Sequence, residues 1–242
     1  MKKLNDLKIK IFADGADIEG IRTLYANPLI KGFTTNPTLM RKAGVSNYET
    51  FGRDVLSMIP DRPVSLEVFA DDFNGMIAQG KTIATWGKNV NVKIPVTNTK
   101  GEFTGPVIKN LASAGVVLNV TAIMTINQVK DVALSLNPDV PAIVSVFAGR
   151  LADTGIDPIP HMTECLAVLK HLPKVELLWA SPRELLNIFH AEEVGCHIIT
   201  ATNDILAKLS LVGKNLDEYS LETVKMFHRD AIAAGFIIKN NC

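Results

Sequence analysis

The segment Asn89-Val90-Asn91-Val92-Lys93-Ile94-Pro95 sets the pattern for the whole chain. Its valines and isoleucine alternate with Asn89, Asn91 and Lys93, so apolar side chains line one face of a predicted short β-strand and polar side chains line the other. Pro95 ends the strand, because proline cannot donate a hydrogen bond to a sheet.

Lys93 is the unusual residue of this strand. An ammonium group is costly to bury unless it is paired with a carboxylate or gives up its proton. Burial and neighbouring cations lower the pKa of a lysine, and the neutral amine can attack a carbonyl carbon to form a Schiff base. The alternative is an ordinary lysine on an edge strand, whose ammonium group reaches the solvent. The other strands bear on this choice.

The composition is that of an ordinary globular protein. Of the 242 residues, 47% are hydrophobic and 21% are charged, and Lys+Arg and Asp+Glu are equal at 25 each. This length fits one large α/β domain or two small ones, and the absence of a composition break predicts a single domain over residues 1–242. The balanced charge gives no reason to expect nucleic acid or a membrane as a partner.

The predicted cellular setting follows from what the sequence lacks. The first residues, Met1 to Asp6, have no apolar core of signal-peptide length, and no window approaches the length of a membrane span. The three cysteines, Cys165, Cys196 and Cys242, are odd in number and widely spaced, which indicates a reducing compartment and neither a zinc site nor a disulfide framework. The histidines show no metal-ligand spacing. We therefore predict a cytoplasmic protein without a metal or other cofactor.

Apolar β-type runs alternate with segments of helical period along the whole chain. The candidate strands cover residues 8–14, 30–35, 63–69, 89–94, 116–121, 142–147, 175–180 and 197–202, and helical period is found over residues 48–58, 73–86, 126–136, 160–171 and 183–194. About eight strand–helix units in roughly 250 residues predict a (β/α)8 TIM barrel. The alternative is a doubly wound open sheet, which predicts a glycine-rich phosphate loop where the chain has Asp14-Gly15-Ala16-Asp17.

The end of the chain is longer than such a barrel needs. Residues 203–211 are predicted to form the closing helix, and residues 216–234 are predicted to form an additional C-terminal helix. We expect this additional helix to pack on its own barrel or on a neighbouring subunit.

Polar side chains recur near the carboxyl ends of the predicted strands, where barrels of this type place their chemistry. Alternation along each strand predicts which of these side chains point inward. The candidates, from the first strand to the seventh, are Asp14; Thr34 and Asn36; Glu67; Lys93; Asn119 and Thr121; Ser145, Phe147 and Arg150; and Ser181 and Arg183. Their coincidence at one end of a barrel predicts a functional site there.

Several of these residues also have a structural interpretation. Asn36 and Ser181 each precede a proline, as a helix-capping residue does when proline occupies the first helical position. Glu67 and Lys93 could form a buried ion pair with only a structural role. Arg183 could be an ordinary surface arginine.

Seven motifs, taken in order, resemble the transaldolase family, and within it the short bacterial-type branch that includes fructose-6-phosphate aldolases. Thr-Thr-Asn-Pro together with Val-Lys-Ile-Pro is the most specific part of this resemblance. The motifs are Phe12-Ala13-Asp14, Gly32-Phe33-Thr34-Thr35-Asn36-Pro37-Thr38, Ser65-Leu66-Glu67-Val68, Asn91-Val92-Lys93-Ile94-Pro95, Leu118-Asn119-Val120-Thr121, Phe147-Ala148-Gly149-Arg150 and Ala180-Ser181-Pro182-Arg183.

The resemblance implies a class I aldolase-type mechanism without a metal. Lys93 would form a Schiff base with the C2 carbonyl of a ketose phosphate such as sedoheptulose 7-phosphate or fructose 6-phosphate. Asp14 would take the proton from the C4 hydroxyl while the C3–C4 bond breaks. Glu67 and Thr121 would position a water that moves protons, and the retained three-carbon enamine would add to an aldose phosphate.

The remaining candidates would bind the substrate. Asn36 and Asn119 would hold the hydroxyls of the bound dihydroxyacetone unit. Arg150 and Arg183, with the Ser181 hydroxyl, suit a terminal phosphate, because guanidinium groups pair with phosphate through two hydrogen bonds. Thr34, Ser145 and Phe147 complete the predicted substrate-binding set.

Two positions favour a transferase over a lyase. The transferase branch carries Glu and Phe where this chain has Glu67 and Phe147, whereas the aldolase branch tends to carry Gln and Tyr. The alternatives are a fructose-6-phosphate aldolase that releases free dihydroxyacetone, and a barrel that binds sugar phosphates without catalysis. The resemblance also implies a ring-like homo-oligomer, a pentamer or a decamer.

The chain departs from the family pattern in three places. Gly15 stands where the family usually has Thr or Ser, and Val146 stands where proline is common. Residues 151–155 are only loosely similar to the corresponding loop. These departures change no catalytic residue type, but they leave the preferred donor and acceptor sugars open.

Overall fold

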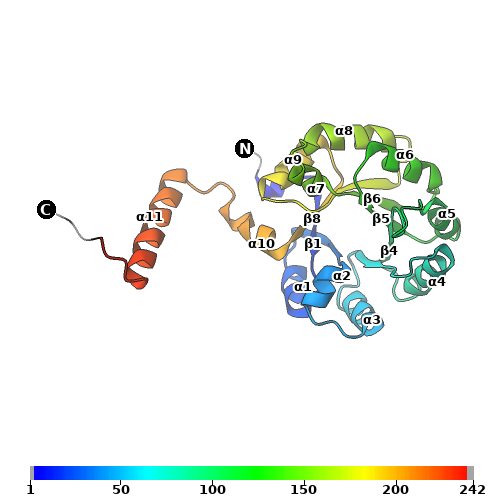
Figure 1. Cartoon of the computed structure of the whole chain (residues 1–242), viewed down its shortest axis with the longest axis horizontal. Coiled ribbons are helices and arrows are strands. Elements are labelled where there is room, and N and C mark those ends of the chain that lie inside the picture. The colour runs from blue at the N-terminus through cyan, green and yellow to red at the C-terminus, as the bar shows by residue number, and fades with distance from the viewer. Residues whose placement is uncertain (1–2, 239–242) are drawn as a thin grey trace.

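The computed structural model describes residues 3–238, and within them eight parallel strands close into a barrel (Figure 1). Each strand pairs with the next one in sequence, and β1 pairs with β8 to close the ring. The predicted (β/α)8 barrel is therefore confirmed, and the open sheet is excluded. The strands are β1 (Lys10–Asp14), β2 (Ile30–Thr34), β3 (Val64–Glu67), β4 (Val90–Pro95), β5 (Leu118–Ile123), β6 (Ala142–Val146), β7 (Val175–Trp179) and β8 (Ile198–Thr202).

Helices surround this barrel and connect its strands (Figure 1). They are η1 (Leu4–Asp6), α1 (Ile18–Tyr25), α2 (Pro37–Lys42), α3 (Tyr48–Met58), α4 (Phe73–Ala84), α5 (Gly105–Ser113), α6 (Ile126–Ser135), α7 (Ala148–Asp153), α8 (Pro158–Leu169), α9 (Leu186–Val194), α10 (Asn203–Leu206), η2 (Ala207–Leu211) and α11 (Leu216–Ala233).

Short polar side chains cap the N-termini of several of these helices. Asp17, Asn36, Asn47, Asp72 and Thr125 each accept a hydrogen bond from the backbone N–H three residues further on. The first turn of a helix cannot satisfy its own N–H groups, so each such cap contributes about 1 kcal/mol. Local sequence thus fixes where the connecting helices begin, and with them the ends of the strand–helix loops.

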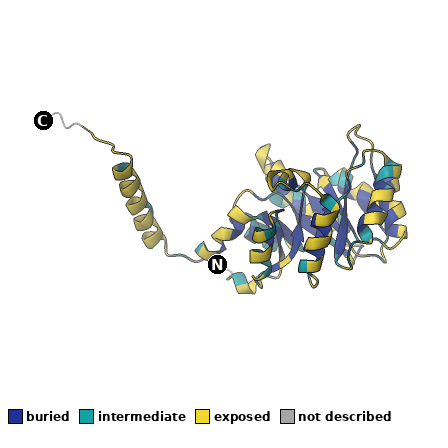
Figure 2. Cartoon of the chain, turned by 90° about the horizontal axis from the view of Figure 1, so that it is seen from below, coloured by how far each residue is buried: buried dark blue, intermediate teal, exposed yellow. Residues whose placement is uncertain are grey.

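Two separate apolar cores hold the layers together. The larger core lies between the strands and the helices. The smaller core fills the inside of the barrel and consists of Phe12, Ile143, Leu178, Ala180 and Ile198, with Phe147 packed against it. Figure 2 shows the consequence, since the strands are buried along their length and the helices are exposed on their outer faces.

Hydrophobic periodicity predicts most element boundaries within a few residues, and α3 has the predicted bounds. The largest difference is at residues 183–194, because α9 begins only at Leu186. Ser181 has a φ of 58°, and the Asn187 side chain accepts hydrogen bonds from the backbone N–H groups of Arg183 and Glu184, so the chain turns before it becomes helical. Ser181 therefore does not cap α9, and that interpretation is wrong.

The C-terminal part differs from the expectation in two ways. The predicted closing helix over residues 203–211 is a short α-helix, α10, followed by the 3-10 helix η2. The additional helix, α11, is present but extends away from the barrel, and none of its residues is buried (Figures 1 and 2). Packing of α11 on its own barrel was therefore a wrong expectation, and packing on a neighbouring subunit stays a prediction.

The structure also bears on the predictions about the cysteines and about membrane spans. Cys165 and Cys196 are buried free thiols, and burial raises the pKa of both to about 12, so they serve as packing residues. Cys242 lies outside the described residues. Across residues 3–238, every helix is too short or too polar to cross a bilayer.

Candidate active site

The carboxyl ends of the strands bring the predicted polar side chains together. In the parallel ladders Glu67 lies beside Lys93, and Lys93 lies beside Asn119. Asp14 lies beside Thr34 in the pairing of β1 with β2. Residues that are neighbours in a ladder project on the same face of the sheet, so these side chains share the inside of the barrel.

Lys93 is 6% exposed and belongs to a strand with neighbours on both sides, which excludes the edge-strand alternative. Its Nζ donates a hydrogen bond to the Thr35 carbonyl oxygen at 2.7 Å and lies 3.1 Å from Glu67 Oε2. Glu67 is therefore the carboxylate that can exchange a proton with Lys93 directly. A structural ion pair would have the same geometry, so the two interpretations differ only in the reactivity of the amine.

Asp14 is the second carboxylate of the site. Thr34 Oγ1 donates a hydrogen bond to Asp14 Oδ1 at 2.8 Å, and Asn36 Nδ2 donates one to Asp14 Oδ2 at 3.2 Å. Burial raises the pKa of the Asp14 carboxyl, although the charge of Lys93 and these two hydrogen bonds oppose the rise. A carboxylate with a raised pKa is the stronger proton acceptor, which is what a general base requires.

Asn36 caps a helix as one prediction has it and also contacts Asp14, while its binding of substrate hydroxyls stays a prediction. Its Oδ1 accepts a hydrogen bond from the Leu39 N–H at 2.9 Å and so caps α2, while its Nδ2 contacts Asp14. The helix cap therefore fixes the orientation of the amide, and that orientation directs the N–H group of the side chain at the carboxylate.

A buried hydrogen-bonded chain fixes Asn119. Its Nδ2 donates to Ser65 Oγ at 3.0 Å, and its Oδ1 accepts a hydrogen bond from Ser145 Oγ at 2.7 Å. Thr121 follows two residues later on β5 and is 3% exposed, and within residues 3–238 its hydroxyl has no hydrogen-bond partner. The Thr121 hydroxyl is thus available to a water or a substrate.

The residues predicted to bind phosphate lie in the segments after β6 and β7. Arg183 forms two hydrogen bonds with Asp153, from Nε to Oδ1 at 2.7 Å and from Nη2 to Oδ2. Arg183 is therefore an exposed but paired arginine, and it lowers the pKa of Asp153. The guanidinium carbon of Arg150 lies 5.6 Å from the centre of the Phe147 ring, a cation–π distance that leaves its N–H groups open to an anion.

Gly149 brings the start of α7 against the loop after β7. Its N–H donates to the Ala180 carbonyl oxygen at 3.2 Å, and a Cβ at this position would lie 1.5 Å from the Ser181 carbonyl oxygen. Only glycine permits this approach. The contact holds Ser181 next to the helix that carries Arg150.

Sequence reasoning missed several residues that support this site. Thr200 on β8 shares a hydrogen bond of 2.6 Å with Thr34, and the alternation rule used for the other strands would have found it. The Tyr48 hydroxyl donates to the Glu67 carbonyl oxygen at 2.8 Å from α3, and Asp153 pairs with Arg183. No local sequence pattern predicts these last two contacts, because each joins elements that are remote in sequence.

The fold and this cluster together define a class of protein, a (β/α)8 barrel with a buried amine and two carboxylates gathered at the carboxyl ends of its strands. Among the described residues, no three or more His, Cys, Asp or Glu side chains are grouped so that they could hold a metal ion. The residues available for chemistry are thus the lysine, two carboxylates, amides and hydroxyls.

Comparison with known proteins identifies the family. The family model described as Transaldolase/Fructose-6-phosphate aldolase matches residues 11–238. A probable transaldolase of Dehalococcoides mccartyi is 33% identical over 202 residues, which is 83% of this chain and 90% of that protein. A probable transaldolase of Thermoanaerobacter sp. is 32% identical over 224 residues, which is 92% of this chain and 98% of that protein. The chain belongs to the transaldolase/fructose-6-phosphate aldolase family, and it is an enzyme of the transferase or aldolase type.

Solved structures show the same architecture at much lower identity. Dihydrodipicolinate synthase from Rhodopseudomonas palustris superposes with a TM-score of 0.56 at 15% identity, covering 95% of this chain and 81% of that one. KGPDC from Streptococcus mutans gives a TM-score of 0.54 at 12% identity, covering 82% of this chain and 89% of that one. These similarities concern the fold alone.

Proposed function

We propose that this protein is a transaldolase that moves a dihydroxyacetone unit from a ketose phosphate, such as sedoheptulose 7-phosphate or fructose 6-phosphate, to an aldose phosphate. The observation that carries the proposal is the buried Nζ of Lys93, 3.1 Å from Glu67 Oε2, in the same cluster as Asp14. The names of the relatives as probable transaldolases support it.

The first step is formation of a Schiff base. The nitrogen of Lys93 attacks the C2 carbonyl carbon, the electron pair of the carbonyl moves to its oxygen, and that oxygen leaves as water after taking up protons. Glu67 is close enough to accept the proton that the nitrogen loses and to return it to the departing oxygen. Thr121, whose hydroxyl has no partner within residues 3–238, would hold the water that carries this proton.

The second step is cleavage. Asp14 takes the proton of the C4 hydroxyl, the C3–C4 bond breaks, and its electron pair passes into the iminium to give an enamine, while the aldose leaves. The raised pKa of Asp14 supports its role as the base. The enamine then attacks the aldehyde carbon of a second aldose, Asp14 returns its proton to the aldehyde oxygen, and water hydrolyses the new iminium and restores Lys93.

The substrate would lie between these groups and the loops after β6 and β7. Asn36 and Asn119 would bind the hydroxyls of the three-carbon unit, and Thr34 and Ser145 would hold Asp14 and Asn119 in place through their hydrogen bonds. Arg150, together with the Ser181 hydroxyl and Arg183, would bind the terminal phosphate.

Borohydride trapping with fructose 6-phosphate tests the central step. Reduction of the Schiff base should leave a permanent mass increase on the peptide that contains Lys93, and Lys93→Ala should show none. Measurable binding of the sugar phosphate without any adduct would favour the non-catalytic barrel, in which Lys93 and Glu67 form only a structural ion pair.

A second experiment separates the transferase from the lyase. With donor alone, a transaldolase retains the three-carbon unit, whereas a fructose-6-phosphate aldolase steadily releases free dihydroxyacetone. Phe147 packs in the apolar core inside the barrel and offers no hydroxyl to protonate the enamine, which supports the transferase. The double variant Glu67→Gln with Phe147→Tyr should raise lyase turnover relative to transfer, and an unchanged ratio would count against this interpretation.

We further propose that the protein is a homo-oligomer, a pentamer or a decamer as the family resemblance implies, in which α11 contacts a neighbouring subunit. No residue of α11 is buried, yet the helix carries large apolar side chains that are exposed to the solvent. They include Leu216, Leu221, Val224, Phe227 and Ile232.

A further inference from the structure

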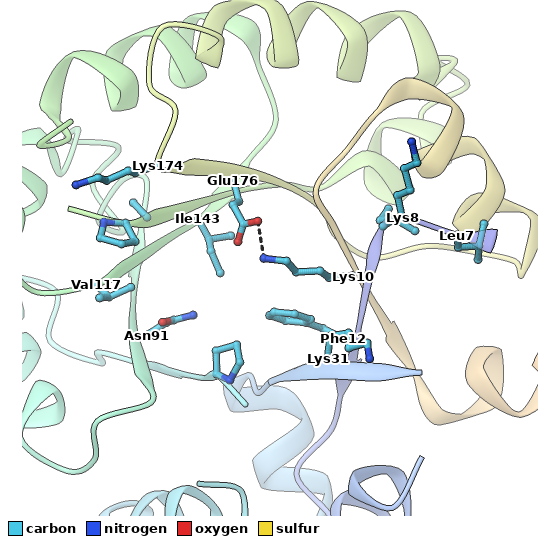
Figure 3. A pocket seen from close by; sticks show the side chains of 14 residues that line it. Leu7, Lys8, Lys10, Phe12, Lys31, Asn91, Val117, Ile143, Lys174 and Glu176 are labelled. Carbon is cyan, nitrogen blue, oxygen red and sulfur yellow. Dashed lines mark hydrogen bonds and ion pairs between the residues drawn. The ribbon is translucent and has the colours of Figure 1, made fainter. Parts of the chain in front are cut away.

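A cavity opens at the end of the barrel where the strands begin, opposite the site around Lys93. It has a volume of about 470 Å³ and is lined by residues at the amino ends of several strands and the segments before them. We call it the amino-end cavity and define it by Lys10, Phe12, Asn91, Ile143 and Glu176 (Figure 3). Phe12 lies one inward position before Asp14 on β1, so its ring separates this cavity from the site around Lys93.

The lining of the amino-end cavity has a surplus of positive charge. Lys8, Lys10, Lys31 and Lys174 line it, and Glu176 is the one acidic residue among the lining residues. Lys10 Nζ lies 2.7 Å from Glu176 Oε1, so that pair is neutral and the other three lysines carry the surplus. Figure 3 shows the Lys8 and Lys174 side chains directed outward, where they contribute charge around the opening and make no contact across it.

Asn91 gives the cavity a hydrogen-bonding group that faces its open space. It is 7% exposed, and its side-chain amide has no hydrogen-bond partner among residues 3–238. Asn119, by contrast, is fixed at both ends of its amide by Ser65 and Ser145. Within residues 3–238 the fully buried side-chain atoms without a hydrogen-bond partner are Trp86 Nε1, His161 Nε2 and Trp179 Nε1, so the Asn91 amide stays accessible to water or a ligand in the cavity.

The side chains of the cavity converge on one space. In Figure 3 the Asn91 amide, the Lys10 ammonium group, the Glu176 carboxylate and the Phe12 ring all point toward its middle. They come from β4, β1 and β7, so the barrel itself holds them in place. A cation, an amide, a carboxylate and an apolar surface around one cavity form a site for a small polar molecule with an anionic group.

We propose that the amino-end cavity binds a small phosphate monoester that carries free hydroxyl groups. Its phosphate would pair with Lys10 and with the surplus charge around the opening, since a lysine binds a compact anion as a point charge. Its hydroxyls would bond to the Asn91 amide and the Glu176 carboxylate, and its carbon atoms would lie on Phe12. This site is independent of the chemistry at Lys93.

Titration calorimetry with sn-glycerol 3-phosphate tests the proposal on the full chain. This probe has no carbonyl group and cannot form a Schiff base with Lys93. Asn91→Leu and Lys10→Gln should each weaken its binding tenfold or more, the second because glutamine can still donate to Glu176 but lacks the charge. The surface variant Lys130→Gln, on α6, is the matched control for loss of one positive charge and should bind as the wild type does.

Two further measurements decide where and how the probe binds. If Arg150→Ala removes the binding while Asn91→Leu and Lys10→Gln leave it intact, the probe occupies the other end of the barrel and the proposal fails. Glycerol alone should not bind, and inorganic phosphate should bind more weakly than the monoester. Equal affinity for phosphate and the monoester would overturn the role assigned to Asn91.

Thermal unfolding gives a readout that does not depend on affinity. Asn91→Leu should abolish the rise in Tm that the probe produces in the wild type. If Asn91→Leu does not fold, Lys10→Gln decides the matter, because its side chain is 49% exposed and tolerates replacement. A full probe-induced rise in Lys10→Gln would then overturn the proposal.

Discussion

Asn36 links helix capping to the electrostatics of the site, and the two functions can be separated by substitution. Asn36→Ser keeps an oxygen that caps α2 and loses the N–H group that reaches Asp14. The free energy of unfolding should change by less than about 0.5 kcal/mol, while kcat/KM falls about tenfold. Asn36→Ala should lose a further ~1 kcal/mol of stability. Urea unfolding and transfer rates measure both, and equal stability of the two variants would contradict the cap.

Asp14 makes both activity and stability depend on pH. Its folded-state pKa is raised above the unfolded value of 3.8, so folding favours the protonated carboxyl, and this contribution is lost as the pH rises through the raised pKa. Asp14→Asn removes that dependence. The difference in Tm between the variant and the wild type should therefore grow in favour of the variant as the pH increases.

The same substitution should abolish the acid limb of the rate profile. If Asp14 is the base, kcat/KM of the wild type rises as its carboxyl ionises, and Asp14→Asn should lose at least about 100-fold in rate. A pH–rate profile over the acid-to-neutral range measures this limb. An unchanged limb in a slow but active Asp14→Asn enzyme would assign the ionisation to another group.

At the scale of elements, the contact between α7 and the loop after β7 depends on Gly149. A methyl group there would meet the Ser181 carbonyl oxygen, so Gly149→Ala should cost about 3 kcal/mol of stability and displace Arg150. Gly155→Ala is the control, because that glycine has a φ of 81° and open space around it, so only the strain of a positive φ, about 1 kcal/mol, is expected. Chemical denaturation compares the two, and equal losses would contradict the close approach.

The short helix α7 also carries Arg150, the residue that we propose binds the terminal phosphate. Arg150 is exposed and its guanidinium lies over Phe147, whereas Arg183 is held by Asp153. Arg150→Ala should raise KM for a phosphorylated donor at least about tenfold and leave KM for the unphosphorylated sugar nearly unchanged. Steady-state kinetics with both substrates measures the ratio. Equal losses for the two would remove the phosphate role.

Alternation along the strands is the reason that so much of this fold could be predicted. A parallel barrel buries both faces of each strand, and the period of two separates an outward face of Val, Ile and Leu from an inward face that includes Asp14, Lys93 and Asn119. What the sequence could not provide is the pairing across elements. The Arg183–Asp153 pair and the Tyr48–Glu67 contact depend on loop geometry, as does the positive φ that delays α9.

At the scale of the whole molecule, α11 is a helix without a core of its own. If it holds subunits together, a chain that ends at Gly213 should sediment as a monomer while its far-UV circular dichroism still shows the barrel, because no residue of α11 is buried in the protomer. Analytical ultracentrifugation of the full and shortened chains measures this. The same number of subunits in both assemblies would place the interface elsewhere.

Closure of the barrel also determines how the protein would aggregate and how it would lose its activity on heating. Every strand within residues 3–238 is hydrogen-bonded on both sides, so the native sheet has no free edge to which a strand of another molecule could add. The shortest ladders, β2 with β3 and β7 with β8, are the seams where the ring would part first, leaving one arc of β8, β1 and β2 and another of β3 to β7. Asp14 belongs to the first arc and Lys93 to the second, so turnover would vanish on heating while most secondary structure persists.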